Sequence, residues 1–149
     1  HVRPQGPLEL TMEKRTLTFA QADAIARAAM DYAREEGLEL AVAIVDDGGW
    51  PHIQVRMDGA FPAAVDAALA KARSAALFRR PTSDFSRRVK EGMPLAHLPH
   101  VVPLGGGVLL ERDGGFFGAM GLSGAREDTE TVLAERIVAD FAAGGIVPT

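Results

Sequence analysis

Three histidines are the first candidates for chemistry in this sequence. His52 lies in a stretch that alternates between polar and apolar residues, and His97 and His100 lie in a proline-rich segment. An imidazole can transfer protons near neutral pH and can bind a metal ion. For each histidine, the plain alternative is a solvated or hydrogen-bonded side chain without a functional role.

Lys71 differs from the other cationic residues because it lies in a run of alanines, where its neighbours are expected to be buried. A lysine held away from water can anchor a carboxylate, act as a base or form a Schiff base with a carbonyl compound. The plain alternative is a structural ion pair with Asp46 or Asp58. The sequence leaves both interpretations open.

A cofactor-free enzyme of a catabolic or biosynthetic pathway is one hypothesis that these residues allow. Lys71 and Arg56 would hold a small carboxylated carbonyl or enamine compound. His52, His97 or Asp46 would move a proton during an isomerisation, hydrolysis or decarboxylation. The sequence has no GxSxG elbow, HExxH zinc motif or Walker lysine, which argues against serine hydrolases, zinc proteases and nucleotide hydrolases.

A basic segment provides further candidates for ligand binding. Residues 71–90 carry seven of the sixteen cationic side chains against one acid, Asp84. Such a segment attracts carboxylates or phosphates; the alternative is a solvated helix surface whose charges pair with the acids of residues 127–130. The candidate ligand-binding residues of the whole sequence are Arg56, Lys71, Arg79, Thr82, His97, Gly105, Gly106, Gly107 and Ser123.

Glycines mark two more places of interest. The run Gly105–Gly107 favours positive φ angles and exposes backbone N–H groups, which can form an anion-binding nest; a flexible strand entry is the alternative. In FFGAMGLS, alternation predicts one face with mostly small residues, namely Phe117, Ala119, Gly121 and Ser123. This face could accept the alanine-rich helix over residues 63–76, a planar ligand or a second subunit. A purely structural interpretation is an oligomeric scaffold, in which alanines such as Ala68 and Ala72 pack against neighbouring subunits.

Helices and hairpins must position these residues. Thr18 and Gln21 have the spacing of a capping box and predict a helix that ends at Gly37. The turn Asp46–Gly49 predicts a hairpin that places His52 and Arg56 on a polar face. An alanine-rich helix over residues 60–80, a short helix over 82–92 capped by Thr82 or Ser83, and a loop over 93–103 follow. A second hairpin turns at residues 113–115, and a helix over 127–141 closes the chain.

The predicted fold class is α+β, with a single antiparallel sheet flanked by helices in the order α-β-β-α-α-β-β-α. Residues 1–15 are expected to form a loose lead-in and residues 16–149 a single domain. The net charge is −4 and no apolar run approaches ~20 residues, so we expect neither nucleic acid nor a membrane as a partner. Cysteine is absent, which excludes disulfides and thiol chemistry. A cytoplasmic location is the default expectation, and export stays open because the sequence begins at His1.

Several short motifs carry a resemblance to a known family. They are IVDDGG (44–49), RMDGA (56–60), KARSAALF (71–78) followed by RPT (80–82), PLGGGV (103–108) and DGGFFGAMGLSGA (113–125). In this order and spacing they resemble the GlcG/HbpS-like family, also called haem-degrading domains, to which the C-terminal domain of PduO-type proteins is similar. The resemblance covers residues 17–143.

The resemblance implies a profilin-like fold that assembles into dimers or higher homo-oligomers and binds haem or a related tetrapyrrole. Haem needs an axial ligand, a flat apolar slot and cations for its propionates. The candidate axial ligands here are His52, His97 and His100, and the basic segment would hold the propionates. We therefore expect a site for an anionic or planar ligand at a subunit junction, bounded by Lys71, the Gly105–Gly107 loop and the strand with His52 and Arg56.

Overall fold

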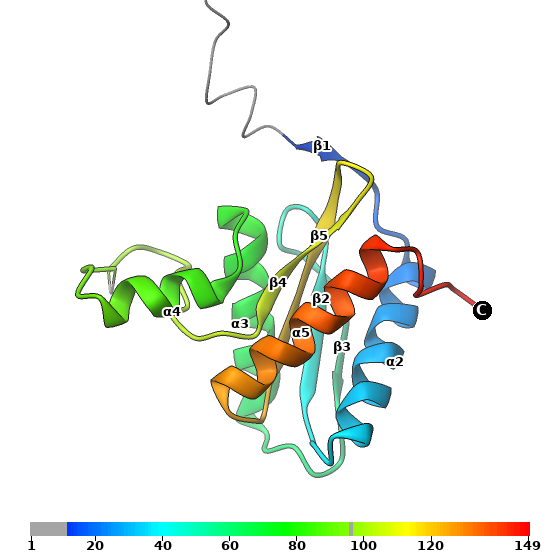
Figure 1. Cartoon of the computed structure of the whole chain (residues 1–149), viewed down its shortest axis with the longest axis horizontal. Helices are drawn as coiled ribbons and strands as arrows, with labels where there is room; N and C mark the ends of the chain where they lie inside the picture. The colour runs from blue at the N-terminus through cyan, green and yellow to red at the C-terminus, as the bar shows by residue number, and fades with distance from the viewer. Residues whose placement is uncertain (1–11, 96) are drawn as a thin grey trace, which may run out of the picture.

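A computed structural model of the chain describes residues 12–95 and 97–149, so most of the expected lead-in lies outside the described residues. Helices and strands alternate much as the sequence predicts (Figure 1). The elements are β1 (Glu13–Lys14), α2 (Phe19–Glu35), β2 (Ala41–Val45), β3 (Pro51–Arg56), α3 (Ala63–Phe78), α4 (Thr82–Lys90), β4 (Gly107–Arg112), β5 (Gly115–Ser123) and α5 (Glu127–Ala142). The class is α+β, as predicted; the profilin-like likeness stays a prediction.

The sheet is mixed, which corrects the prediction of a purely antiparallel one. Its main part runs β4-β5-β2-β3 with antiparallel neighbours throughout. The long strand β5 pairs with β2 only over residues 119–123. β2 therefore leaves the first residues of this edge of β5 unpaired. The short strand β1 pairs with them in parallel, with Glu13 opposite Gly115.

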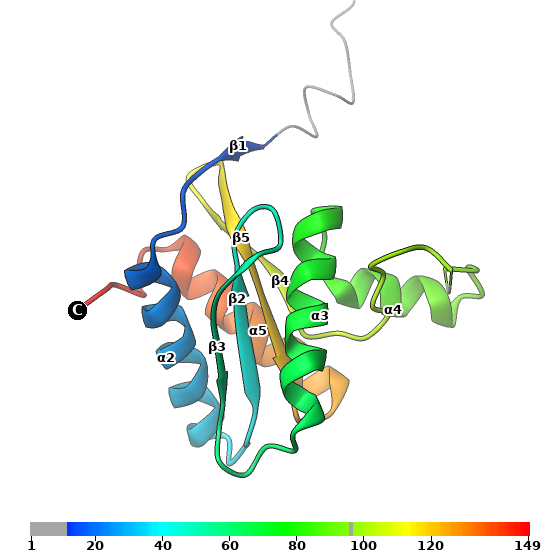
Figure 2. The ribbon, with the colours of Figure 1, turned by 180° about the vertical axis from the view of Figure 1, so that it is seen from behind.

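Helices cover both faces of the sheet. α2 and α5 pack on one face and α3 on the other, as Figures 1 and 2 show from opposite sides. The core under α2 and α5 contains large side chains such as Ile25, Leu110 and Phe141. The core under α3 consists mainly of alanines and brings the backbone of the helix close to the sheet.

Gly121 explains why the face of β5 under α3 carries only small side chains near this position. A Cβ atom at this position would lie 1.9 Å from the carbonyl oxygen of Ala68 and 2.7 Å from the backbone nitrogen of Ala72. Both alanines are completely buried. The small face is therefore filled by this chain's own helix, and the expectation that Ala68 and Ala72 face a neighbouring subunit is wrong.

A register shift at Gly118 breaks the predicted alternation of β5. Leu110 pairs with Gly118 but Glu111 pairs with Phe116, so Phe117 has no direct partner on β4. As a result Phe117 faces the α5 side, where its ring lies edge-on to Phe141 at 5.3 Å. Phe117 does not share the face of Ala119 and Gly121, as strict alternation predicts.

Of the four helices in the described chain, only α2 begins with a side-chain cap. Thr18 and Gln21 form the predicted capping box of α2. The N-cap of α4 is Pro81, and neither Thr82 nor Ser83 caps the helix. Thr82 is instead the first helical residue and is buried. α4 and the loop after it project from the side of the sheet next to β4 (Figure 1). No helix of the described residues is long and apolar enough to cross a bilayer.

Candidate functional site

Lys71 forms a buried ion pair, which was the structural alternative for this residue, but its partner is Glu130 and not Asp46 or Asp58. Its Nζ atom lies 2.7 Å from Glu130 Oε1 and donates a further hydrogen bond of 3.1 Å to the carbonyl of Leu122. Only 4% of Lys71 and 2% of Glu130 are exposed. Neither Asp46 nor Asp58 takes this role. The amine thus joins α3, β5 and α5 and is not open to a substrate.

The other oxygen of Glu130 holds the end of β5. Glu130 Oε2 accepts hydrogen bonds from the backbone N–H groups of Gly124 at 2.7 Å and Ala125 at 2.8 Å. Both oxygens of this buried carboxylate therefore accept hydrogen bonds, which offsets the cost of burying the charge. The sequence analysis missed this role, because it grouped Glu130 with the solvated acids of residues 127–130.

The Gly105–Gly107 loop directs its N–H groups to side chains of the same chain. Gly105 donates to Glu127 Oε1 and Gly107 to Thr82 Oγ1, each at 2.8 Å. Gly106 has a φ of +119°, and a Cβ there would lie 2.6 Å from the carbonyl of Leu122. The loop thus carries one carboxylate already, that of Glu127.

The three predicted catalytic residues do not come together within one subunit. Asp46 accepts hydrogen bonds from Gly48 and Trp50 in the turn that precedes His52. It follows Val45, which pairs with Ala119. Lys71 contacts Leu122, three residues further along β5, or about 10 Å along a strand. Asp46 and His52 therefore lie at one end of the sheet and Lys71 near the other.

Arg56 and Ser123 share one cross-strand row. Arg56 pairs with Ala41, and Ala41 pairs with Ser123. Two strand spacings, or about 10 Å, separate the backbones of the outer two. Arg56 is exposed at the edge of the sheet, whereas Ser123 is buried.

Arg79 supports the fold around the end of α3. It is the left-handed C-cap residue of the helix, with a φ of 54°. Its guanidinium donates to the carbonyls of Asp47, at 2.9 Å, and Ala76. It also lies over the ring of Phe116 at 4.1 Å, which is within the range of a cation–π contact.

The histidines lie on different sides of the molecule. His52 is half-buried on β3, the edge strand opposite β4. His97 and His100 are exposed in the loop that follows α4, on the β4 side. No group of three or more His, Cys, Asp or Glu side chains in the described part of the chain could hold a metal ion. His52 and the pair His97 and His100 therefore cannot serve the same haem iron within one subunit.

Most charges of the basic segment are paired. Asp84 lies 3.2 Å from both Arg80 and Arg88 and also contacts Arg87. Burial raises the pKa of Asp84, but the hydrogen bond from Arg87 and the three positive charges outweigh it and hold the pKa below its ordinary value. The positive charges of α4 are therefore largely neutralised by ion pairs, as the alternative interpretation of this segment expected, but their main partner is Asp84.

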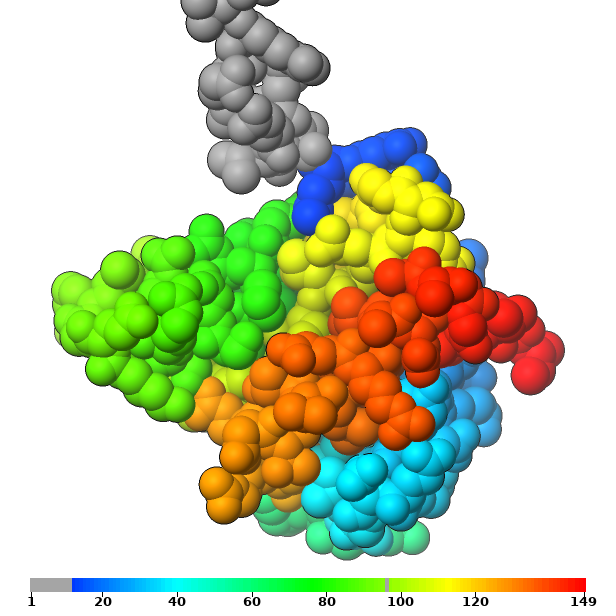
Figure 3. All heavy atoms as spheres, in the orientation of Figure 1, coloured from blue at the N-terminus to red at the C-terminus, as the bar shows by residue number. Residues whose placement is uncertain are grey.

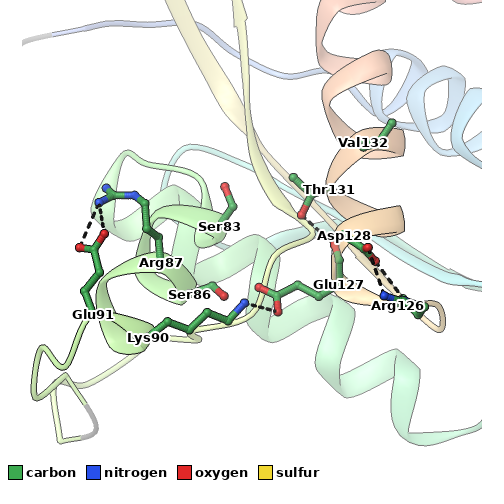
Figure 4. Close-up of a pocket in the computed structure, with 10 residues that line it drawn as sticks. All are labelled: Ser83, Ser86, Arg87, Lys90, Glu91, Arg126, Glu127, Asp128, Thr131 and Val132. Carbon is green, nitrogen blue, oxygen red and sulfur yellow. Dashed lines mark hydrogen bonds and ion pairs between the residues drawn. The ribbon is translucent and has the colours of Figure 1, made fainter.

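A groove between α4 and the start of α5 has the size of a ligand site. Its volume is about 950 Å³, near the upper end of the range of about 300–1,000 Å³ typical of small-molecule sites. Figure 3 shows the α4 lobe and the first turns of α5 meeting at this surface. The residues that line the groove are Ser83, Ser86, Arg87, Lys90, Glu91, Arg126, Glu127, Asp128, Thr131 and Val132 (Figure 4).

The sequence analysis did not identify this groove. For Arg87 and Lys90 the sequence favoured a solvated helix surface whose charges pair with the acids of residues 127–130, and Lys90 does contact Glu127. The hydroxyl groups of Ser86 and Thr131 were not among the candidates. The available signal was the helical spacing of Ser83, Ser86, Arg87 and Lys90, which places them on one face of α4. The opposite wall comes from α5, and its approach to α4 is a tertiary feature that no local pattern shows.

Glu127 crosses the groove and is held on three sides. Its carboxylate accepts the Gly105 N–H and lies 3.4 Å from Lys90 Nζ, and the Ser86 hydroxyl is close enough to contribute to its lowered pKa. Burial raises the pKa of Glu127, but the bonds from Ser86, Gly105 and Lys90 outweigh it and lower the pKa below its ordinary value. The groove therefore contains a set of donors arranged for a carboxylate.

Comparisons with known proteins agree on one family. The model of the family described as "Haem degrading protein HbpS-like" matches residues 17–139. Protein GlcG of Escherichia coli K12 is 35% identical over 111 residues, which is 74% of this chain and 83% of GlcG. The corrinoid adenosyltransferase PduO of Salmonella typhimurium is 31% identical over 133 residues, 86% of this chain but only 40% of PduO.

Solved structures show the same fold. Klebsiella pneumoniae protein ORFY superposes with a TM-score of 0.79 at 28% identity, covering 90% of this chain and 96% of ORFY. The PduOC:heme complex superposes with a TM-score of 0.75 at 29% identity, covering 84% of this chain and 94% of PduOC.

Proposed function

Because the chain belongs to the family of HbpS-like haem-degrading proteins, we propose that it binds haem or a related tetrapyrrole in the groove between α4 and α5. The observation that carries this proposal is the structural likeness to PduOC, which was solved as a complex with heme. The groove has a volume of about 950 Å³ and three cationic lining residues, Arg87, Lys90 and Arg126, which suit such a ligand.

The lining of the groove fits the carboxylate side of haem. Arg87, Lys90 and Arg126 line its walls and could pair with the two propionates, since charge-assisted hydrogen bonds to carboxylates are strong. Val132 is 68% exposed at the rim and offers apolar contact. The iron would supply the redox or ligand-binding chemistry of the bound cofactor.

The groove itself lacks an axial ligand, and Val132 is the one apolar residue among those of the described chain that line it. None of the three histidines is among the described residues that line it. His97 and His100 are exposed and belong to the loop that leaves α4 just after Glu91, so this loop is the proposed source of the ligand. His52 lies on the opposite edge of the sheet and could contribute only from a second subunit.

Titration of the protein with haemin tests the proposal. A saturable shift of the Soret band at one equivalent is expected, and His97→Ala or His100→Ala should change the position of the band. His52→Ala serves as the matched control, because His52 lies on β3, at the edge of the sheet far from α4. A linear, non-saturating absorbance increase for the unmodified protein would overturn the proposal.

The cofactor-free enzyme has less support than haem binding. It requires Lys71 to hold a substrate, but that amine is buried between Glu130 and Leu122. Its proposed proton-moving groups, Asp46 and His52, lie at the other end of the sheet. No single described site joins these residues.

We also propose that the chain forms a homodimer through the outer face of α3. Ala63, Asp66, Ala70 and Leu77 are exposed on this face, and Arg73 is half-buried among them. In the described chain neither Asp66 nor Arg73 has an ion-pair partner within 4.0 Å. Two such helices packed antiparallel about Ala70 would place Asp66 of each opposite Arg73 of the other, which is the self-complementary pattern of a two-fold interface. Arg73 also overlies the ring of Trp50 at 5.5 Å, and Trp50 is 67% exposed. The same interface would bury part of this ring.

A further inference from the structure

The carboxylate of Glu127 sits in a cradle that two segments build, the loop before β4 and helix α4. The loop before β4 provides the Gly105 N–H at 2.8 Å. α4 provides the ammonium group of Lys90 at 3.4 Å (Figure 4) and the nearby Ser86 hydroxyl, which contributes to the lowered pKa of Glu127. A backbone N–H, a hydroxyl and a cation together are the donors that recognise a carboxylate in ligand sites. Here the ligand position is filled by the chain itself.

The three donors differ in how freely they can be rearranged. Ser86 is only 4% exposed, and Gly105 is buried, with a built Cβ only 2.2 Å from Thr131 Oγ1. These two donors are therefore fixed in place. Lys90 is 71% exposed and Glu127 is 29% exposed on their side chains, so these two can move toward solvent. The fixed part of the cradle remains when Glu127 leaves.

Moving the Glu127 side chain out of the cradle should cost the fold little stability. Its neighbour Glu130 holds the structural contacts of α5, with Lys71, Gly124 and Ala125. Glu127 has an exposed partner in Lys90, and such pairs contribute little to stability. Replacing it by another carboxylate would exchange one charge-assisted set of hydrogen bonds for an equivalent one.

We infer that Glu127 is an internal competitor, which occupies a carboxylate-binding cradle formed by Gly105, Ser86 and Lys90 and yields it to a carboxylate of the ligand. The inference rests on the proposed function for its location, since the cradle lies inside the groove. It adds a specific ligand group, a carboxylate, and a residue that sets the affinity for it. In haem that group is a propionate.

The test uses acetate as the probe and the backbone amide signal of Gly105 as the reporter. With Glu127→Ala, acetate should produce a saturable shift of this signal, with an affinity about tenfold higher than for the unmodified protein. A tenfold gain corresponds to removing one charge-assisted competitor. Ser86→Ala in the same background should abolish the gain. Sodium chloride at equal ionic strength measures the general salt effect.

Asp128→Ala is the matched control, because Asp128 lines the same groove and its loss changes the net charge equally. Asp128 pairs with Arg126 and accepts a hydrogen bond from the backbone N–H of Thr129, and in the described chain no hydrogen bond or ion pair joins it to the cradle donors. An equal gain for Asp128→Ala, or no gain for Glu127→Ala, would overturn the inference. If Glu127→Ala fails to fold, Glu127→Gln keeps the size and one acceptor, and it should show a smaller gain; no gain would again overturn the inference.

Haemin separates this inference from the haem proposal. Glu127→Ala should bind haemin more tightly than the unmodified protein, whereas haemin dimethyl ester, which lacks free carboxylates, should show no gain. If acetate binding rises but haemin does not bind at all, the cradle stands and the haem proposal fails. If haemin binds with unchanged affinity in Glu127→Ala, the competitor role fails and the haem proposal stands.

Discussion

The ammonium group of Lys71 lies 2.7 Å from the carboxylate of Glu130, and almost no part of either side chain reaches solvent. The pair joins the middle of α3 to the first turn of α5 across the end of β5. A buried ion pair contributes little net stability, but the loss of one partner leaves a charge without compensation. The pair therefore acts as a structural link under the wall of the groove.

Replacing Lys71 by Met should destabilise the protein by about 3–5 kcal/mol, because Glu130 would keep its charge without its cation. Urea unfolding followed by circular dichroism measures this change. Arg34→Met, which removes an exposed ion pair with Asp31, should cost less than about 1 kcal/mol. The assignment is wrong if the two variants lose the same small amount.

Gly121→Ala should be far more harmful than an ordinary glycine substitution. The new Cβ would meet the backbone of α3 at 1.9 Å, and neither element can yield without opening the alanine core. We expect a loss of more than about 3 kcal/mol, seen as a lower thermal midpoint or as insoluble protein. Gly48→Ala is the control, since its Cβ would have ordinary contacts of 3.5 Å and longer. Normal stability of Gly121→Ala would show that α3 does not approach the sheet so closely.

Asp84 should contribute stability that disappears in acid. Its pKa is lowered in the folded protein, so its contribution is present above the unfolded value of about 3.9 and is lost as the pH falls through the folded value. The side chain is 22% exposed, and we expect Asp84→Asn to cost about 1 kcal/mol at pH 7. Unfolding at pH 7 and near pH 3 measures the difference between the two proteins. A difference that stays constant or grows toward low pH contradicts the arginine cluster as its cause.

Charge reversal on α3 tests the proposed dimer. Asp66→Arg should place like charges opposite each other across the two-fold axis and dissociate the assembly, as measured by light scattering after gel filtration. The double variant Asp66→Arg/Arg73→Asp should restore it, because each new charge again faces its opposite. Unchanged assembly of Asp66→Arg, or a monomeric unmodified protein, would place the interface elsewhere or exclude it.

Local signals predicted much of the fold. The capping box of Thr18 and Gln21 and the turn at Asp46–Gly49 act within a few residues, so the sequence shows them directly. The polar face of β3 likewise follows from alternation: Ile53 and Val55 pack on the α2 side, which leaves His52 and Arg56 on the other. Gly118 could not be interpreted in this way, because its conflict is with the carbonyl of Val45 on a neighbouring strand.

The candidate site was harder to predict than the fold. Lys71 was correctly expected to be buried, but its partner Glu130 is 59 residues away, and nearer acids were equally compatible with the sequence. The groove has the same difficulty, since Ser86 and Glu127 meet only after α4 and α5 have packed. Contacts between distant segments decide both cases, and residue types alone do not determine which distant segments meet.

The broadening of backbone amide signals by bound ferric haemin locates the ligand most directly. The paramagnetic iron broadens signals of nearby residues in a two-dimensional NMR spectrum of the labelled protein. At one equivalent of haemin, the signals of Ser83, Ser86 and Thr131 should broaden, whereas those of Gln54 and Val55 on β3 should remain sharp. Broadening confined to β3, with sharp signals along α4 and the start of α5, would contradict haem binding in the groove.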